Sequence, residues 1–308
     1  MSRPLISLVI TDLDNTVYDW LTAFVPAFYA MVRVAAPLIE VDEEELLDDL
    51  QAVHRKHGDS EHPFALLETI AVQRKFGDKP RNETARILDT AFHAFNQIRK
   101  RNLQLYDGVY NTLERFSQLR VPVVAYTDAR VINCLFRLNR LGVKRFISRL
   151  YAPGHISKEV DQSALTDDFV RVLPPDDRKP NPKTLLDICA EYRVSPSEAA
   201  YIGDSLVRDI YMAHRAGLHS AWARFGTLYD KALWPKLVRI THWTDIDVER
   251  ESMLRDEARG VKPDCVLDNF SDLLNCFEFN GRYGQFFGCA DLNARSGPPG
   301  SQRTPTGP

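Results

Sequence analysis

The sequence contains few cysteines, and none of them are spaced as Cys-x-x-Cys. Their number is odd and their spacing matches no zinc site, so neither a disulfide framework nor a structural zinc is expected. We expect free thiols in a reducing compartment. The five cysteines among the 308 residues are Cys134, Cys189, Cys265, Cys276 and Cys289.

Long apolar runs are also missing from the sequence. No stretch approaches the roughly 18 consecutive apolar residues of a transmembrane helix. The first apolar run, residues 5–10, is short and leads directly to acidic residues, whereas a signal peptide has a longer apolar segment and a cleavage site. A cytoplasmic protein without a membrane partner is therefore expected.

The sequence also lacks an excess of positive charge. The chain has 39 Lys and Arg against 42 Asp and Glu, a formal net charge of -3 at pH 7. Such a chain has no global basic field, so no nucleic-acid partner is expected. Its 44% hydrophobic and 26% charged residues are typical of a globular protein. Its length allows one large domain or two.

Short apolar runs alternate with helical patterns along much of the chain. This alternation predicts an α/β fold, with a doubly wound, mostly parallel sheet covered by helices on both faces. Glycine follows two of the expected helices, where it is favoured at a helix end. The expected strands are residues 5–10, 121–126, 146–151, 169–173, 199–202, 220–223 and 265–267, and the expected helices include 131–141, 182–192 and 209–216.

One long block has helical patterns and no convincing strand. It covers residues 19–106, and its acidic run 42–45 precedes apolar residues as at the start of a helix. We expect an all-helical domain here, inserted into an α/β core made of residues 1–18 and 107–279. Residues 280–308 are rich in glycine, proline and polar residues, so a disordered tail is expected.

Polar side chains follow three of the expected strands. Asp12 and Asp14 come after the first, two residues apart, so they lie on the same side of an extended chain. Thr127 and Asp204 follow two others. Ligands bind beyond the carboxyl ends of the strands in such sheets, so these side chains should form one site. Neighbouring carboxylates repel each other and need a cation, a shared proton or a basic side chain.

Each of these residues also has an ordinary structural interpretation. The acidic pair could form a polar turn, and Thr127 could cap the helix that follows it. Lys179 could be a solvated lysine in a proline-rich loop, with Lys183 as a rival nearby. Asp204 and Asp209 could be a turn residue and a helix cap. The order and spacing of all these residues together favour a functional site.

Four motifs together resemble the haloacid dehalogenase superfamily of phosphohydrolases. The resemblance implies a Rossmann-like core and, for the branch with an insertion between the first two motifs, a helical cap over the site. The match is loose at residues 152–177, which are longer than usual, and at 228–263, which are an extra excursion. The motifs are Asp12-Leu13-Asp14-Asn15-Thr16, the threonine that ends Val123-Val124-Ala125-Tyr126-Thr127, Lys179-Pro180-Asn181-Pro182, and Gly203-Asp204-Ser205-Leu206-Val207-Arg208-Asp209.

The resemblance also implies a role for each motif residue. Asp12 would be the nucleophile and would form an aspartyl-phosphate, and Asp14 would act as general acid and base. Thr127, Asp128 and Lys179 would bind the phosphate. A Mg²⁺ ion would offset the repulsion between carboxylate and phosphate. Its expected ligands are Asp12, the backbone carbonyl of Asp14, Asp204 and Asp209.

The favoured function is a Mg²⁺-dependent phosphatase that acts on a small phosphorylated metabolite. The resemblance implies that Asp14 favours phosphate esters, because dehalogenases of the superfamily lack an aspartate there. Sugar phosphates, phosphoglycolate and nucleotides are all compatible substrates. A phosphomutase on the same core, or a catalytically idle binding or regulatory protein, remain alternatives at this point. The sequence does not predict an oligomeric state.

Overall fold

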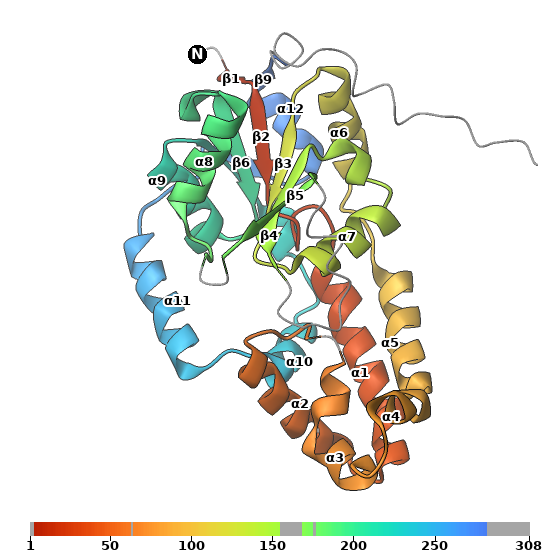
Figure 1. Ribbon diagram of the computed structural model, residues 1–308. Helices are drawn as coiled ribbons and strands as arrows, with labels where there is room; N and C mark the ends of the chain where they lie inside the picture. Colours follow the sequence, from red (N-terminus) through yellow and green to blue (C-terminus); the bar gives the residue numbers. More distant parts are fainter. Residues whose placement is uncertain (1–2, 63, 155–167, 175–176, 282–308) are drawn as a thin grey trace, which may run out of the picture.

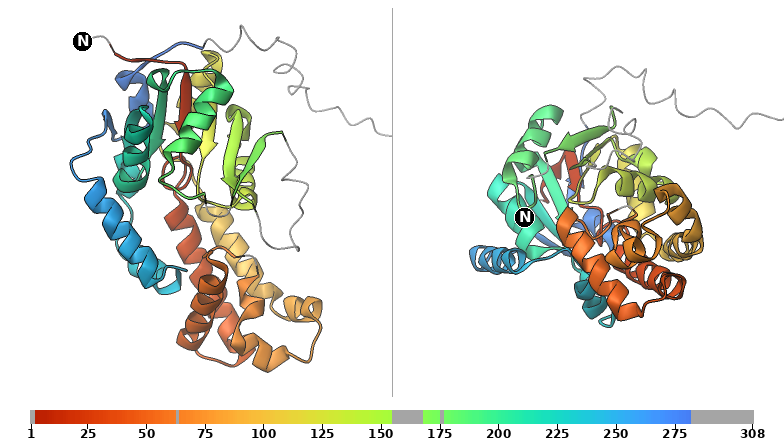
Figure 2. Two further views of the ribbon diagram at one scale, coloured as in Figure 1. Left: turned by 60° about the vertical axis from the view of Figure 1, so that its left-hand side comes forward. Right: turned by 60° about the horizontal axis from the view of Figure 1, so that its bottom comes forward.

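The chain folds into two bodies joined end to end (Figures 1 and 2). The structure is a computed structural model and describes residues 3–62, 64–154, 168–174 and 177–281. One body carries the main sheet and the other is helical. The predicted tail, 280–308, lies outside the described residues except for its first two. Of these, Asn280 donates its backbone N–H to the Ile6 carbonyl at 3.0 Å, so it continues a strand pairing.

In the described part of the chain, seven parallel strands form the main sheet in the order β5-β4-β3-β2-β6-β7-β8. The central strand β2 lies between β3 and β6, so the chain changes direction across the sheet beside β2. Ligands bind at such switch points. The strands are β2 (Leu8–Thr11), β3 (Val123–Tyr126), β4 (Arg149–Pro153), β5 (Val170–Leu173), β6 (Ala199–Gly203), β7 (His219–Ala223) and β8 (Cys265–Leu267).

Helices cover both faces of this sheet (Figure 1). One apolar layer lies between the sheet and α8 with α9, and a second lies between the sheet and α6, α7 and α12. The predicted Rossmann-like α/β fold is therefore confirmed. The helices are α6 (Val109–Gln118), α7 (Val131–Arg140), α8 (Pro182–Tyr192), α9 (Tyr211–Ala216) and α12 (Leu273–Cys276).

The first predicted strand, 5–10, is divided at Ser7. Its first part, β1 (Leu5–Ile6), pairs with β9 (Glu278–Phe279) in a separate two-stranded sheet, and only β2 enters the main sheet. The backbone N–H of Ser7 donates to the Glu198 carbonyl at 2.8 Å at the point of division. An apolar run does not reveal that its two halves pair with different partners.

Helices α1 to α5 form the helical body in the range 19–106. Helices α1 and α5 make its most extensive contact, and both lead back toward the sheet (Figure 1). Phe24 and Phe28 are buried in its core, on the apolar face of α1. The helices are α1 (Trp20–Ile39), α2 (Glu43–His57), α3 (Ile70–Phe76), α4 (Arg81–Ile87) and α5 (Asp89–Asn102).

No segment was expected to be apolar enough to span a membrane, and this expectation is wrong, because α1 is long and apolar enough by length and composition alone. Helix α1 has 20 residues and a mean hydropathy of 1.5. In the structure, 56% of its most apolar window is buried inside the protein. The helix is apolar because it is the central helix of the helical body, packed against α2, α5 and α10.

Residues 228–263, called the strap below, connect the two bodies. Within the strap, α10 (Leu233–Ile240) buries Leu237 and Ile240 in the core of the helical body. Helix α11 (Asp245–Glu257) then returns to the sheet-bearing body (Figure 1). There Glu251 accepts two hydrogen bonds from Arg208, at 2.9 and 3.1 Å. The range predicted as core thus contains a helix that packs with the insertion.

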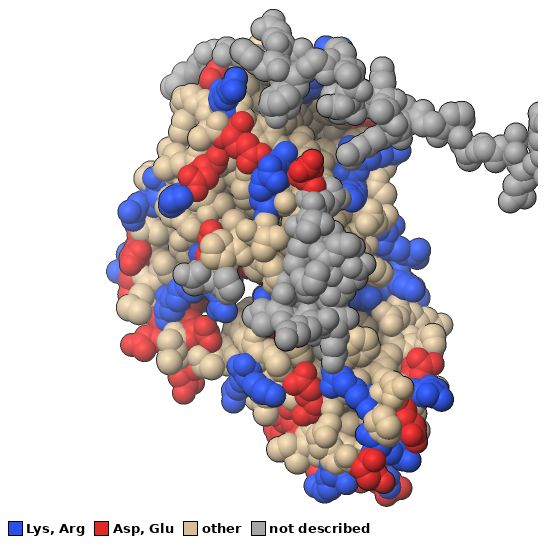
Figure 3. Space-filling model, in the orientation of Figure 1, with Lys and Arg blue, Asp and Glu red and all other residues tan. Residues whose placement is uncertain are grey.

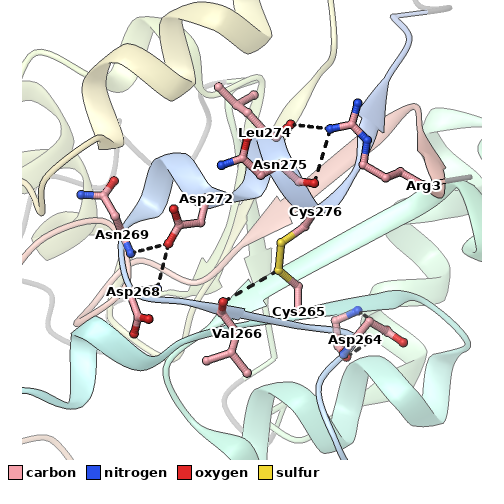
Figure 4. The surroundings of a disulfide bond; sticks show 11 residues. Arg3, Asp264, Cys265, Val266, Asp268, Asn269, Asp272, Leu274, Asn275 and Cys276 are labelled. Carbon is pink, nitrogen blue, oxygen red and sulfur yellow. Dashed lines mark hydrogen bonds between the residues drawn. A yellow bond between two sulfur atoms is a disulfide. The ribbon is translucent and has the colours of Figure 1, made fainter. Parts of the chain in front are cut away.

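Two of the cysteines are joined, so the expectation of free thiols is wrong for this pair. Cys265 in β8 and Cys276 at the end of α12 form a disulfide (Figure 4). They are 11 residues apart and their Cα atoms are 6.2 Å apart, because α12 turns back along β8. Cys134 and Cys189 are free and buried, and Cys289 lies outside the described residues.

Candidate active site

The carboxyl ends of the central strands bring the predicted acidic residues together. Asp12 follows β2, and its backbone N–H donates to the Ile202 carbonyl in β6 at 2.8 Å. Asp204 follows β6, and Asp209 follows one turn later. One oxygen of each of these three carboxylates lies within 4.8 Å of the others. The predicted convergence of strand ends therefore holds for this part of the site.

Lys179 places its ammonium group between two of these carboxylates. Its Nζ lies 2.7 Å from Asp12 Oδ1 and 3.0 Å from Asp209 Oδ1, and its side chain is only 4% exposed. The ammonium also faces the rings of Tyr126 and Tyr201. Burial lowers the pKa of Lys179, but the nearby carboxylates outweigh burial and raise it well above its ordinary value. The two carboxylates therefore favour the charged form of Lys179 and hold it in place.

Asp209 is positioned by a π-helical turn over Leu206–Ile210. Its Oδ2 accepts the Ser205 backbone N–H at 3.0 Å, and its Oδ1 accepts the Tyr201 hydroxyl at 2.9 Å. A Cβ on Gly203 would lie 2.3 Å from its carboxyl carbon, so only glycine allows this approach. Asp209 thus fixes both Lys179 and the loop that carries Asp204.

The charge balance of the acidic cluster fits a bound divalent cation. Burial raises the pKa of Asp12 to about 7 against the lowering effect of Lys179. Burial, and then the charges of Asp209 and Asp12, also raise the pKa of Asp204. Lys179 offsets only part of the negative charge of the three carboxylates, and an all-oxygen donor set suits a hard ion such as Mg²⁺.

Thr127 and Asp128 lie where β3 ends. The buried Thr127 Oγ1 accepts the Ala129 backbone N–H at 3.2 Å, which leaves the hydroxyl proton available for another acceptor. Asp128 Oδ1 accepts the Lys179 backbone N–H at 3.1 Å. The Asp128 carboxylate thus ties the threonine motif to the lysine motif.

Asp14 is not one of the three clustered carboxylates and bonds to Arg137 instead. It accepts a hydrogen bond from Arg137 Nη1 at 3.1 Å and its side chain is 23% exposed. The next residue, Asn15, has a φ of 56°, a left-handed conformation that asparagine tolerates. A Cβ on Gly226 would lie 1.7 Å from the Asn15 carbonyl oxygen, so the loop after β7 packs directly on this turn.

Comparison with known proteins identifies the family. The model of the haloacid dehalogenase-like hydrolases matches residues 6–217. The chain belongs to this family. The chain is 27% identical over 265 residues to a glyceraldehyde 3-phosphate phosphatase of Methanopyrus kandleri, covering 84% of this chain and 100% of the relative. It is 25% identical over 268 residues to an N-acetylmuramic acid 6-phosphate phosphatase of Pseudomonas aeruginosa, covering 86% and 100%.

A solved structure agrees with the fold of this haloacid dehalogenase-like hydrolase. A 2-haloacid dehalogenase of Pseudomonas syringae aligns with a TM-score of 0.53 and 21% identity, over 88% of this chain and 97% of the other. The predicted superfamily and fold are confirmed. The family and the phosphatase relatives also confirm the prediction of an enzyme that hydrolyses phosphoric monoesters.

A cavity of about 250 Å³ opens above the motif residues of the hydrolase. Its floor is formed by Asp14, Asp128 and Lys179, which the sequence had predicted. Its roof is formed by the loop after α2 and by the strap, and Figure 3 shows the surface hollowed between the two bodies. The roof residues that the sequence did not single out as site residues are Gly58, Asp59, Ser60, Glu61, Leu237, Thr241, His242, Trp243, Asp247, Arg250, Glu251 and Leu254.

Arg137, which contacts Asp14, was not identified from the sequence. It lies on α7 three residues after the buried Cys134 and next to the buried Leu138, so it occupies the apolar face of the helix. An arginine at such a position needs a buried counter-charge. That signal was present in the helical pattern of residues 131–141. Trp20, the first residue of α1, also lines the cavity.

Proposed function

We propose that this hydrolase is a Mg²⁺-dependent phosphatase that transfers the phosphoryl group of a small phosphomonoester to Asp12 and then to water. The observation that carries this proposal is the Asp12–Lys179 contact of 2.7 Å, beside two further carboxylates and beneath a cavity. A buried lysine against a carboxylate provides a nucleophile and a fixed positive charge for a phosphoryl group.

The first step breaks the bond between phosphorus and the ester oxygen. An Asp12 oxygen forms a bond to phosphorus, and the leaving oxygen takes a proton from Asp14. In the second step Asp14 removes a proton from water, whose oxygen attacks the phosphorus and releases phosphate and the Asp12 carboxylate. Lys179 and the Thr127 hydroxyl stabilise the phosphoryl oxygens, and Asp128 maintains the spacing of their two loops.

Mg²⁺ would supply positive charge between the nucleophile and the phosphate. Asp12, Asp204 and the backbone carbonyl of Asp14 would hold it. Asp209 already accepts bonds from Lys179, Tyr201 and Ser205, so its contribution to the metal would be mainly to orient these neighbours.

The helical body serves as a cap in this proposal. Its loop after α2 forms part of the cavity roof, so it excludes water and contacts the part of the substrate that does not react. The cavity volume of about 250 Å³ favours a small metabolite. The two relatives are named for small phosphorylated sugars, which supports a substrate of this class. We place the enzyme in the cytoplasm, where such metabolites occur.

The test is phosphate release from a broad panel of phosphomonoesters with Mg²⁺, for the natural chain and for Asp12→Asn. The natural chain should turn over at least one ester, and Asp12→Asn should abolish turnover while the fold is retained. Asp187→Asn is the matched control, because Asp187 is exposed and pairs only with Lys183 among the described contacts. An inactive natural chain, or an active Asp12→Asn variant, would refute the proposal. Isomerised sugar phosphate without net phosphate release would indicate a mutase.

A further inference from the structure

Residues 58–62 form a loop of the helical body that contacts the sheet-bearing body; we call it the docking loop. Its two ends are held together by Glu68. The Glu68 carboxylate lies 2.7 Å from His57 Nε2 and 2.9 Å from His62 Nε2. The two imidazole rings stack at a centroid distance of 3.6 Å. The docking loop therefore leaves the helical body as a closed and well-defined turn.

Three consecutive residues of the docking loop contact different partners. Asp59 Oδ2 lies 3.2 Å from Arg130 Nε, just before α7. The Ser60 hydroxyl lies 2.9 Å from His242 Nδ1 in the strap. Glu61 pairs with Arg137, inside α7. Only the last of these partners also contacts a residue with a proposed chemical role.

Arg137 holds two carboxylates with one guanidinium group. Its Nη1 donates to Asp14 Oδ1 at 3.1 Å, and its Nη2 donates to Glu61. Its side chain is only 3% exposed, so these carboxylates are its counter-charges in place of water. The planar fork of arginine can bond two acceptors at fixed directions, which the single ammonium of a lysine cannot do.

We propose that Arg137 is a positioning residue that makes the orientation of Asp14 depend on docking of the loop. This inference rests on the proposed function, because it assigns Asp14 the proton transfers. Glu61 belongs to the helical body and Asp14 to the sheet-bearing body, and Arg137 is the group that bonds both. When Glu61 is in place, the guanidinium is fixed at both ends and Asp14 is fixed with it.

The surroundings of the three groups explain why a docked Glu61 would matter. The Tyr18 ring lies 5.7 Å from the Arg137 guanidinium carbon, and it limits movement of the fork on one side. Asp14 is 23% exposed and lines the cavity, so one side of its carboxylate faces the substrate and the other faces Arg137. Without Glu61, the fork loses one of its two anchors and can turn, and Asp14 loses its fixed direction.

The experiment measures kcat/KM for a series of aryl phosphates whose leaving groups differ in pKa, with Mg²⁺ present, because kcat/KM reports the first step and not the hydrolysis of the aspartyl-phosphate. In that step, poor leaving groups need protonation by Asp14, whereas good leaving groups do not. Glu61→Gln should therefore lower kcat/KM at least tenfold for the poorest leaving group and less than threefold for the best. Arg137→Lys should show the same dependence. When Glu61→Gln and Arg137→Lys are combined, the two losses in rate should not multiply, because both substitutions break the same chain of contacts.

The matched control is Asp59→Asn. It removes the other ion pair between the docking loop and α7, but that pair does not reach Asp14. Its rate should keep the leaving-group dependence of the natural enzyme, whatever its absolute value. Circular dichroism and thermal unfolding establish that each variant is folded. If Arg137→Lys fails to fold, Glu61→Gln alone carries the test, because it leaves Arg137 paired with Asp14.

Two results would overturn the inference while leaving the proposed function intact. One is an equal loss for good and poor leaving groups in Glu61→Gln, which would make the pair a structural tie only. The other is the same leaving-group dependence in Asp59→Asn as in Glu61→Gln, which would make loop docking in general, and not Arg137, responsible. Failure of the proposed function would appear separately, as a natural chain that releases no phosphate.

Discussion

The floor and the roof of the cavity are formed by different kinds of structural element. The floor, which we take to include the acidic cluster beneath it, has Asp12 and Asp209 buried and each bonded to Lys179, on strand ends and the loops beside them. The roof residues come from the docking loop and the strap, which lie far apart in the sequence. Among the described residues, the roof arginine Arg250 is exposed and contacts no carboxylate, and it approaches only the Lys179 carbonyl, at 3.5 Å.

In the proposed function, the floor carries out the reaction and the roof selects the substrate. A strand end fixes the direction of its side chain because the sheet fixes the strand, so the floor needs little help from the rest of the chain. The roof depends on the packing of two bodies and can change without disturbing the sheet. We therefore expect floor changes to lower kcat and roof changes other than those at Glu61 mainly to affect KM.

Metal removal should have the largest effect, because it acts on the floor as a whole. The pKa of both Asp12 and Asp204 is raised, first by burial, in a cluster whose only nearby fixed cation among the described residues is Lys179. A phosphate dianion added to this cluster needs further positive charge. Exhaustive chelation should reduce turnover to background, and Mg²⁺ should restore it, whereas Na⁺ at equal ionic strength should not. Full activity of dialysed, metal-free enzyme would contradict this.

Lys179→Met should lower kcat by at least about 10²–10³-fold, comparable to the loss of one preorganised donor. The variant removes the cation that lies 2.7 Å from Asp12. Lys183→Met is the matched control, because Lys183 is 79% exposed and contacts Asp187. Its kcat should remain within about twofold of the natural enzyme. Phosphate release at saturating substrate gives both values, and a larger loss in Lys183→Met would mean that the lysine motif was assigned to the wrong residue.

The sequence predicted the floor far better than the roof. Asp12 and Asp204 could be placed because each ends an apolar run, and a parallel sheet brings such ends together. Lys179 could be placed only through the family resemblance, since a lysine in a loop carries no periodicity. Arg137 carried a signal on the apolar face of α7, but its partner Glu61 is 76 residues away.

The strap shows the limit of local patterns most clearly. Residues 228–263 were expected to be an extra excursion within the range assigned to the core, and the apolar residues of α10 pack into the helical body. Apolar residues specify that a helix is buried, but not in which of two cores. The split of the first strand at Ser7 has the same cause, since β1 pairs with β9, which is distant in the sequence. The Cys265–Cys276 pair is only 11 residues apart, and it depends on how α12 turns back along β8.

Arg250→Ala tests the roof and should have a moderate effect. Its guanidinium lines the cavity and is exposed, so its contact with substrate would contribute at most about 1 kcal/mol. KM should rise up to about fivefold, with kcat within about twofold. Arg255→Ala on the same helix is the control, because Arg255 does not line the cavity. A loss in kcat as large as that of Lys179→Met would remove the distinction between floor and roof.

Protonation of His54 should weaken the contact between α2 and the strap, and only at acidic pH. At pH 7 this is the smallest of the expected effects. His54 lies in α2 and is 1% exposed, and its Nδ1 lies 2.6 Å from the Ile240 carbonyl in α10. A carbonyl oxygen accepts a hydrogen bond, so Nδ1 must carry a proton, as it can in a neutral or a charged ring. Burial lowers its pKa from 6.5 to about 4. Because the unfolded chain binds the proton more readily, stability should fall as pH falls from about 6.5 to about 4.

The decrease in the free energy of unfolding should reach about 3 kcal/mol at about pH 4 and should vanish above about pH 7. Chemical unfolding at a series of pH values measures it, and His54→Gln should remove this part of the pH dependence. His93→Gln should not, because His93 is 76% exposed. If His54→Gln leaves the pH dependence unchanged, the contact between α2 and the strap does not rely on a neutral imidazole. The roof would then be held by its apolar packing alone, through Leu237 and Ile240.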